Sequence, residues 1–234
     1  MTFDRKHLLL YAVTDRSWTG EKTLREQVES ALKGGVTCVQ LREKKQDPAA
    51  FLAEAKEIGA LCRRFKVPFL INDNVEIALA CGADGVHVGQ NDMPVSLARQ
   101  KLGPDKIIGV SAHSVREALD TVRDGADYLG AGAVFSTSTK TDTSVLSLET
   151  LRAICDAVPV PVVAIGGIHE SNILKLSGSH AAGAALVSAI FAAGDIEQAC
   201  RRLRALAEQM VSGDGERVLS EQTAPDRTER RTDL

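Results

Sequence analysis

Eight short apolar runs recur along the chain, and segments with helical periodicity separate them. The runs are LLLYAV at 8–13, VTCVQL at 36–41, PFLI at 68–71, GVHV at 85–88, KIIGV at 106–110, DYLGA at 127–131, PVVAI at 161–165 and GAALV at 183–187. Strands that alternate with helices favour a parallel sheet, because each helix returns the chain to the same edge of the sheet. Eight such units fit a closed (β/α)8 barrel, the TIM barrel, better than an open doubly wound sheet, which usually has fewer strands.

The connecting segments carry the residues that begin and end helices. Thr23 and Glu26 have the spacing of a capping box, and Gly34-Gly35 follows at the expected end of that helix. Asp47-Pro48 places an N-cap residue and a first-turn proline before the next apolar stripe. These signals support the alternation of strands and helices.

Composition indicates one domain with a polar end. A hydrophobic content of 44% over 234 residues is enough for a single buried core. From Ser212 the sequence becomes polar, SGDGERVLSEQTAPDRTERRTDL, with little to bury. We therefore predict a single barrel domain over residues 1–211 and a disordered C-terminal tail over residues 212–234.

Charge and composition argue against several classes of partner. The net charge is −3 and aromatic residues make up 4%, so we expect no binding to nucleic acid. We expect neither a secretory signal nor a membrane partner, since no apolar run approaches the roughly 18 residues that span a bilayer. The five cysteines form no C-x-x-C pair and are typical of core positions. These features predict a soluble, cytoplasmic protein, and they leave its oligomeric state open, a homo-oligomer included.

The end of the second predicted strand carries two cations. In QLREK, residues 40–44, Gln40, Arg42 and Lys44 share one face of a strand, and Leu41 points the other way. Active sites of (β/α)8 barrels lie at the carboxyl ends of the strands. Cations that point into the barrel need anionic partners, which are carboxylates of the protein or phosphates of a ligand. A solvated loop with extended side chains is the alternative.

Asn-Asp pairs follow the third and fourth predicted strands. Asn72-Asp73 and Asn91-Asp92 reach the same mouth if those strands are neighbours. Two carboxylates beside Arg and Lys suit a Mg2+ ion that also takes phosphate oxygens and waters. Asn-Asp after a strand also commonly caps the next helix or makes an Asx turn. The occurrence of both pairs beside a cationic strand end favours the metal site.

Later strands end in groups that suit phosphate and a heterocycle. The hydroxyl-rich loop 136–140, STSTK, ends in a cation, and Gly166-Gly167 and Val187-Ser188 follow the seventh and eighth strands, where barrels often hold phosphate. Ser111 at the end of the fifth strand suits a polar contact to a heterocycle. His113 is more typical of a helix start than of a base for Ser111, and His87 of a hydrogen-bonded structural histidine.

In order and spacing, these motifs resemble those of the thiamine phosphate synthase family, also called thiamine-phosphate pyrophosphorylase. The resemblance runs from YAVTD to VSAIF and excludes only the polar tail. The segments that carry it are QLREK at 40–44, IND at 71–73, GVHVGQND at 85–92, GVSAH at 109–113, STSTK at 136–140, AIGGI at 164–168 and ALVSAIF at 185–191. The family pattern usually has proline at the position of Ser136 and often Asp at that of Asn91.

The resemblance implies a (β/α)8 enzyme that joins 4-amino-2-methyl-5-hydroxymethylpyrimidine diphosphate to a thiazole phosphate and releases diphosphate. Its implied pyrimidine diphosphate ligands are Gln40, Leu41, Arg42, Glu43, Lys44, Asn72, Ser111 and Lys140. Its implied thiazole phosphate ligands are Thr137, Ser138, Thr139, Gly167, Val187 and Ser188. Mg2+ is the implied cofactor, held by Asp73 and Asp92, and the implied catalytic residues are Arg42, Lys44, Ser111 and Lys140.

Two other functions use a similar barrel. A thiazole tautomerase would need the thiazole phosphate site but neither a diphosphate site nor a metal, so the joint presence of Arg42, Lys44, Asp73, Asp92 and Lys140 argues against it. A catalytically silent phospholigand-binding protein would be expected to have lost some of these groups. We therefore expect small-molecule substrates and synthase chemistry.

Overall fold

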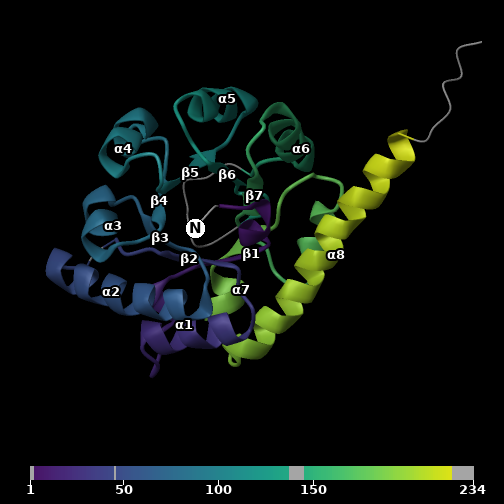
Figure 1. Ribbon diagram of the computed structural model, residues 1–234. Helices are drawn as coiled ribbons and strands as arrows, with labels where there is room; N and C mark the ends of the chain where they lie inside the picture. Colours follow the sequence, from purple (N-terminus) through teal and green to yellow (C-terminus); the bar gives the residue numbers. More distant parts are fainter. Residues whose placement is uncertain (1–2, 45, 137–144, 223–234) are drawn as a thin grey trace, which may run out of the picture.

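The chain forms a closed barrel of eight parallel strands in sequence order, as predicted (Figure 1). The computed structural model describes residues 3–44, 46–136 and 145–222, with side chains up to residue 213. Each strand pairs with the next one along the chain, and β8 pairs with β1 to close the sheet. The strands are β1 Leu10–Val13, β2 Cys38–Leu41, β3 Phe69–Asn72, β4 Gly85–Val88, β5 Ile107–Ala112, β6 Tyr128–Gly132, β7 Val162–Ile165 and β8 Ala184–Leu186.

Helices surround the barrel on its outer side. The α-helices are α1 Leu24–Lys33, α2 Pro48–Phe65, α3 Val75–Cys81, α4 Val95–Leu102, α5 Val115–Arg123, α6 Leu148–Ala157, α7 Ser188–Phe191 and α8 Ile196–Gln222. Three 3-10 helices complete the described elements: η1 Arg5–Leu8, η2 Arg16–Trp18 and η3 Ile173–Leu176. In the described connection from β7 to β8, η3 takes the place that an α-helix has in most of the other units.

The predicted helix starts are confirmed. The hydroxyl of Thr23 accepts from the backbone N–H of Glu26, whose carboxylate accepts in return from the backbone N–H of Thr23. Asp47 caps α2 by accepting from two backbone N–H groups, with Pro48 in the first turn. These local signals place α1 and α2 on the outside of β1 to β3.

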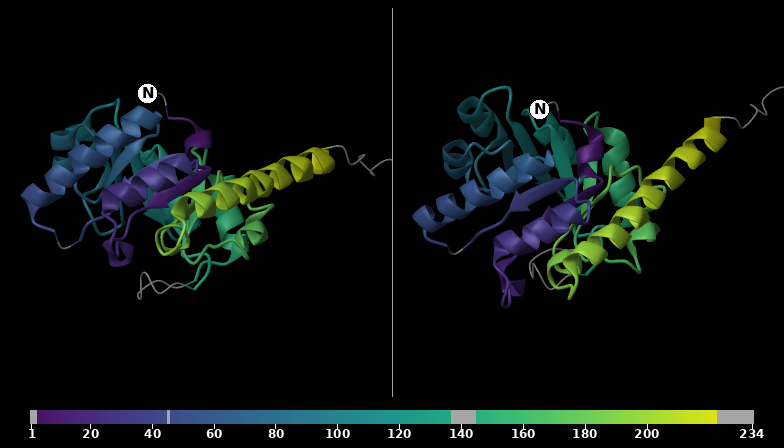
Figure 2. Two further views of the ribbon diagram at one scale, coloured as in Figure 1. Left: turned by 90° about the horizontal axis from the view of Figure 1, so that it is seen from below. Right: turned by 60° about the horizontal axis from the view of Figure 1, so that its bottom comes forward.

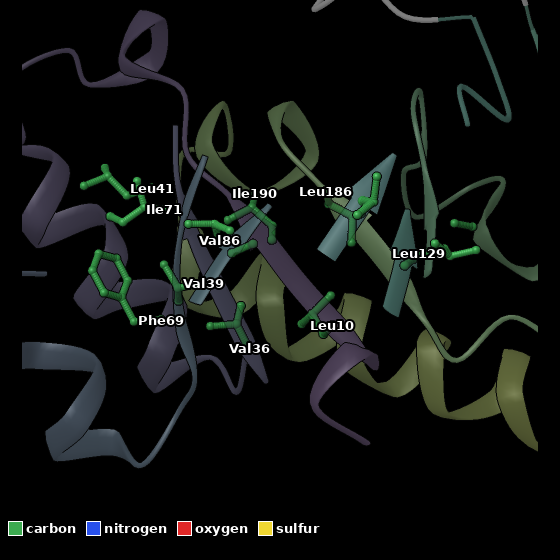
Figure 3. Packing of buried hydrophobic residues seen from close by; sticks show 14 of the residues in the cluster. Leu10, Val36, Val39, Leu41, Phe69, Ile71, Val86, Leu129, Leu186 and Ile190 are labelled. Carbon is green, nitrogen blue, oxygen red and sulfur yellow. The ribbon is translucent and has the colours of Figure 1, made fainter. Parts of the chain in front are cut away.

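Two separate sets of apolar residues fill the fold. The larger set lies between strands and helices and contains Val39, Leu41, Phe69 and Ile71 (Figure 3). The smaller set lies inside the barrel and contains Leu8, Tyr11, Val13, Cys38, Leu70, Ile107, Tyr128 and Val163. Successive residues of a strand therefore alternate between the helices and the barrel interior. On β2, this alternation turns Gln40 inward and Leu41 outward.

Helix α8 extends into the segment that we predicted to be a disordered tail. It continues to Gln222, so residues 212–222 are helical rather than irregular, and the helix extends past the barrel in Figures 1 and 2. The sequence there contains Glu, Arg, Leu and Gln, which are good helix formers, and Pro225 is the first proline after it. Residues 223–234 of the predicted tail lie outside the described residues. Within the described part of the chain, no helix is long and apolar enough to cross a membrane.

Candidate active site

A pocket opens at the carboxyl ends of the strands and receives an inward-facing residue from every strand. Its strand residues are Val13, Gln40, Asn72, His87, Ser111, Gly130, Gly132, Ile165, Ala185 and Leu186. The loops that follow the strands add Arg42, Lys44, Asp73, Gly89, Asp92, His113, Ala133, Gly166, Gly167, Ile168, Val187 and Ser188. The structure thus brings together most of the predicted site residues that it describes.

The two predicted cations and two predicted carboxylates lie on the same side of this pocket. Lys44 Nζ is 3.2 Å from Asp73 Oδ2. Burial raises the pKa of Asp73, the nearby Asp92 carboxylate raises it further, and Lys44 opposes both effects. The Asp73 and Asp92 carboxylates therefore lie close together in a partly buried site. The positive charge of Lys44 does not fully offset the cost of keeping Asp73 charged there. This arrangement fits a divalent cation with oxygen ligands.

Neither Asn-Asp pair caps a helix, so the alternative interpretation of these pairs as helix caps is wrong. Asn74 caps α3 through a bond from the backbone N–H of Ile77, and α4 has Pro94 at its N-cap without a side-chain bond. Asp73 has φ +62°, a conformation that Asp tolerates better than most residues, and its N–H donates to the carbonyl of His87 at 2.8 Å. Asp92 Oδ2 accepts from the N–H of Gly89 at 2.7 Å.

The opposite side of the pocket is formed by backbone at the ends of β7 and β8. Gly166 and Gly167 have φ values of +104° and +63°. A Cβ atom on Gly167 would lie 2.4 Å from the carbonyl oxygen of Ser136, so only glycine fits this turn. Val187 and Ser188 complete this side at the start of α7. Small residues and exposed backbone leave room for a phosphate group to approach closely.

The floor of the pocket is polar. Ser111 Oγ lies 3.1 Å from Nε2 of His87, and Nδ1 of His87 lies 2.8 Å from the hydroxyl of Tyr128. His87 is thus a hydrogen-bonded residue of the barrel interior, as predicted. His113 pairs with Glu117 at 3.1 Å on the first turn of α5, in agreement with its interpretation as a helix-start residue.

The structure does not bring two of the predicted ligands to the pocket. Leu41 is fully buried among the residues between strands and helices. Glu43 turns away to Arg16, with 3.1 Å between the guanidinium and the carboxylate, and burial raises its pKa. Both corrections follow from strand alternation, which puts Leu41 and Glu43 on the face opposite to Gln40, Arg42 and Lys44. Thr137, Ser138, Thr139 and Lys140 lie outside the described residues.

Sequence reasoning missed Arg16, Tyr11 and Tyr128. Arg16 holds both Glu43 and Glu54 and so supports the loop that carries Arg42 and Lys44. The two tyrosines are buried beneath the pocket floor. The sequence signal that could have identified the tyrosines is the alternation of inward and outward side chains along β1 and β6, which turns Tyr11 and Tyr128 inward.

The described residues contain no cluster of three or more His, Cys, Asp or Glu side chains that could hold a metal ion. A site of two carboxylates therefore depends on oxygens from substrate or water to complete a coordination shell. This is the usual situation of Mg2+ bound with phosphate substrates.

Comparison with known proteins points to one family. The model of the family described as "Thiamine monophosphate synthase" matches residues 10–190. The chain is 49% identical to the thiamine-phosphate synthase of Clostridium acetobutylicum over 192 residues, 82% of this chain and 91% of the relative. It is 50% identical to that of Chloroflexus aurantiacus over 198 residues, 84% and 91%. The structure of thiamine phosphate pyrophosphorylase from Pyrococcus furiosus superposes with a TM-score of 0.82 at 40% identity, over 88% of this chain and 98% of that one.

Proposed function

This chain belongs to the thiamine monophosphate synthase family, and we propose that its pocket joins 4-amino-2-methyl-5-hydroxymethylpyrimidine diphosphate to a thiazole phosphate. The products are thiamine phosphate and diphosphate. One observation carries the proposal: a single pocket has a charged side, with Arg42, Lys44, Asp73 and Asp92, and a glycine-rich side formed by β7 and β8. Two phosphorylated substrates can therefore meet between them.

The charged side suits the pyrimidine diphosphate. Arg42 and Lys44 would pair with the diphosphate oxygens, as charge-assisted hydrogen bonds to phosphate do elsewhere. Asn72, at the end of β3, lines the same pocket and offers an uncharged polar group. We assign Lys140 to the same diphosphate from the family resemblance alone.

Asp73 and Asp92 would hold Mg2+ on the charged side. Burial and the neighbouring Asp92 carboxylate raise the pKa of Asp73, and a divalent cation bound there would favour the charged form of both carboxylates. Mg2+ bound there would supply positive charge that stabilises departing diphosphate. The short bond from Gly89 N–H fixes one oxygen of Asp92 and leaves the other oxygen for a ligand.

The glycine-rich side suits the thiazole phosphate. Gly167, Val187 and Ser188 line it, and Thr137, Ser138 and Thr139 are assigned to it from the family resemblance. A phosphate bound there would anchor the thiazole with its ring nitrogen toward the floor. The reacting atoms are then held at short range, which lowers the entropic part of the barrier.

The reaction needs no protein nucleophile. The carbon–oxygen bond of the pyrimidine methylene breaks, both electrons leave with diphosphate, and the electron-rich aminopyrimidine ring spreads the positive charge. Arg42 and Lys44 stabilise the negative charge on the departing group. The thiazole nitrogen then donates its electron pair to the methylene carbon and forms the new carbon–nitrogen bond. The described pocket accords with this, since Ser111 Oγ faces Nε2 of His87 on the pocket floor and Nδ1 of His87 faces the Tyr128 hydroxyl rather than a carboxylate.

The tautomerase and silent-binder alternatives receive no specific support. The described pocket retains Arg42, Lys44, Asp73 and Asp92, which neither alternative requires.

The test is diphosphate release by the purified protein with both substrates and Mg2+. We expect release that needs each substrate, stops with a chelator, and nearly vanishes in Asp92→Ala. Asp105→Ala, an exposed aspartate outside the pocket, is the matched control and should behave as wild type. A wild type that releases no diphosphate, yet binds thiazole phosphate, would show that the charged side does not bind pyrimidine diphosphate.

A further inference from the structure

A continuous chain of hydrogen bonds crosses the barrel interior beneath the pocket. Gln40 Nε2 donates to the Tyr11 hydroxyl at 2.7 Å, and that hydroxyl lies 2.9 Å from the Tyr128 hydroxyl. The Tyr128 hydroxyl lies 2.8 Å from Nδ1 of His87, whose Nε2 lies 3.1 Å from Ser111 Oγ. Both ends of the chain, Gln40 and Ser111, line the pocket, and its five members come from five different strands.

The two tyrosines are costly to place here unless their hydroxyls are paired. Tyr11 is 1% and Tyr128 0% exposed, in a space that branched apolar side chains usually fill. Burial raises the pKa of both tyrosines well above the usual value, so each keeps its proton. Gly109 provides the room, because a Cβ atom there would lie 2.0 Å from Cζ of Tyr128. The surrounding barrel is thus shaped around this chain.

The donors and acceptors allow one direction along the chain, which Gln40 sets at its own end. The amide nitrogen of Gln40 can only donate, so the Tyr11 oxygen accepts. The proton of Tyr11 then has two acceptors in reach, the Tyr128 oxygen and the Cys38 thiol, and a thiol is the weaker acceptor. When Tyr11 donates to Tyr128, Tyr128 donates its own proton to Nδ1 of His87.

The same direction continues to the pocket. A neutral imidazole that accepts at Nδ1 carries its proton on Nε2, and this proton points to Ser111 Oγ. Ser111 accepts from His87 and keeps its hydroxyl proton for the pocket. At the other end, Gln40 has committed its nitrogen to Tyr11, so its carbonyl oxygen is the group left to a ligand.

We propose that Tyr128 is a positioning residue that fixes the tautomer of His87 and so makes Ser111 a donor, and that Tyr11 engages the Gln40 nitrogen and so makes Gln40 an acceptor toward the substrate ring. An aminopyrimidine has the complementary groups, an amino donor and ring-nitrogen acceptors. The identity of that ring rests on the proposed function, whereas the direction of the chain does not.

The first test is 15N NMR of His87 in the ligand-free protein, assigned by the signals lost in His87→Gln. In wild type we expect the proton on Nε2 and none on Nδ1. Tyr128→Phe keeps the ring but removes the donor to Nδ1, so a fraction of the Nδ1–H form, with Ser111 donating to Nε2, should appear beside the Nε2–H form. Tyr11→Phe should keep the wild-type signals, because Tyr128 can still donate to Nδ1. A wild-type proton on Nδ1, or the same signals in wild type and Tyr128→Phe, would overturn the proposal.

The second test separates positioning from stability. Loss of one buried hydrogen bond should raise the KM of Tyr128→Phe for pyrimidine diphosphate about tenfold and leave the KM for thiazole phosphate unchanged. Leu70→Ala, which removes apolar contacts inside the same barrel, is the control and should not discriminate between the substrates. Equal changes in both KM values for Tyr128→Phe would refute the positioning role. If the NMR pattern holds but wild type shows no turnover, the proposed function fails and the direction of the chain stands.

Discussion

At the scale of single residues, the pocket depends on where charge is placed. Arg42 follows β2 on the inward face, and Lys44 on the same face pairs with Asp73. Among the described residues no carboxylate forms an ion pair with Arg42, so Arg42 is the cation more available to a ligand's phosphate.

Arg42→Ala should therefore lower kcat/KM about 100-fold, since it removes positive charge where negative charge develops. Arg116→Ala, on the outer surface of α5 with 93% of its side chain exposed, is the control and should leave kcat/KM unchanged. Steady-state kinetics with each substrate varied would measure both variants. An Arg42→Ala enzyme with wild-type kcat/KM would remove Arg42 from the catalytic residues.

Residue-level prediction succeeded where one strand decides the outcome. The alternation of side chains along QLREK was enough to predict that Gln40, Arg42 and Lys44 point into the pocket. It also places Leu41 and Glu43 on the opposite face, so their assignment as ligands, which followed the family motif as a block, was wrong in geometry. The chain through Tyr11, Tyr128 and His87 needs the register of several strands at once, and no single stretch of sequence contains that information.

At the scale of elements, the loops after the strands hold the site in place. Arg16 in η2 bonds Glu43 after β2 and Glu54 in α2, and Glu43 lies between Arg42 and Lys44 in the sequence. The loop of one βα unit thus fixes the cationic strand end of the next.

Arg16→Ala should raise the KM for pyrimidine diphosphate by roughly threefold, the scale of a partly exposed ion pair, with the KM for thiazole phosphate unchanged. Arg16→Lys keeps the charge and should recover part of the loss. Kinetics of both variants, with Arg116→Ala as control, would check this. A rise in both KM values would instead indicate a general loss of structure.

Gly167 tests the other side of the pocket. Its φ of +63° and its closeness to the Ser136 carbonyl leave no space for a side chain. Gly167→Ala should displace the loop and raise the KM for thiazole phosphate roughly 10- to 100-fold, the usual effect of misplacing a bound group by about 1 Å.

The control for this variant is Gly194→Ala, where a Cβ atom would meet nothing within 4 Å. It should leave both KM values unchanged. If a folded Gly167→Ala protein had wild-type kinetics, the thiazole phosphate would not bind beside Gly167.

At the scale of the whole molecule, the barrel was predictable because eight apolar runs and the helix starts agree on one architecture. The length of α8 was not, because helix propensity favours a helix over residues 212–222 whereas their polar composition is typical of a disordered tail. Among the described side chains of α8, the last fully buried one is Met210.

Truncation after Val211 should therefore leave turnover unchanged and shift Tm by no more than about 2 °C, as expected for loss of surface contacts. Truncation after Arg202 removes buried Leu203, Ala207 and Met210 and should destabilise the fold by several kcal/mol, more than about 4. Thermal unfolding and turnover of the two proteins would measure the difference. Loss of activity in the protein truncated after Val211 would show that residues 212–234 are part of the functional domain.

The most direct measurement of the central claim is simultaneous quantification of thiamine phosphate, by mass spectrometry, and diphosphate during one reaction of the wild-type protein. We expect both products to appear in a one-to-one ratio, only when pyrimidine diphosphate, thiazole phosphate and Mg2+ are all present. Diphosphate without thiamine phosphate, or neither product from a folded protein that binds thiazole phosphate, would contradict the claim that the two substrates react in this pocket.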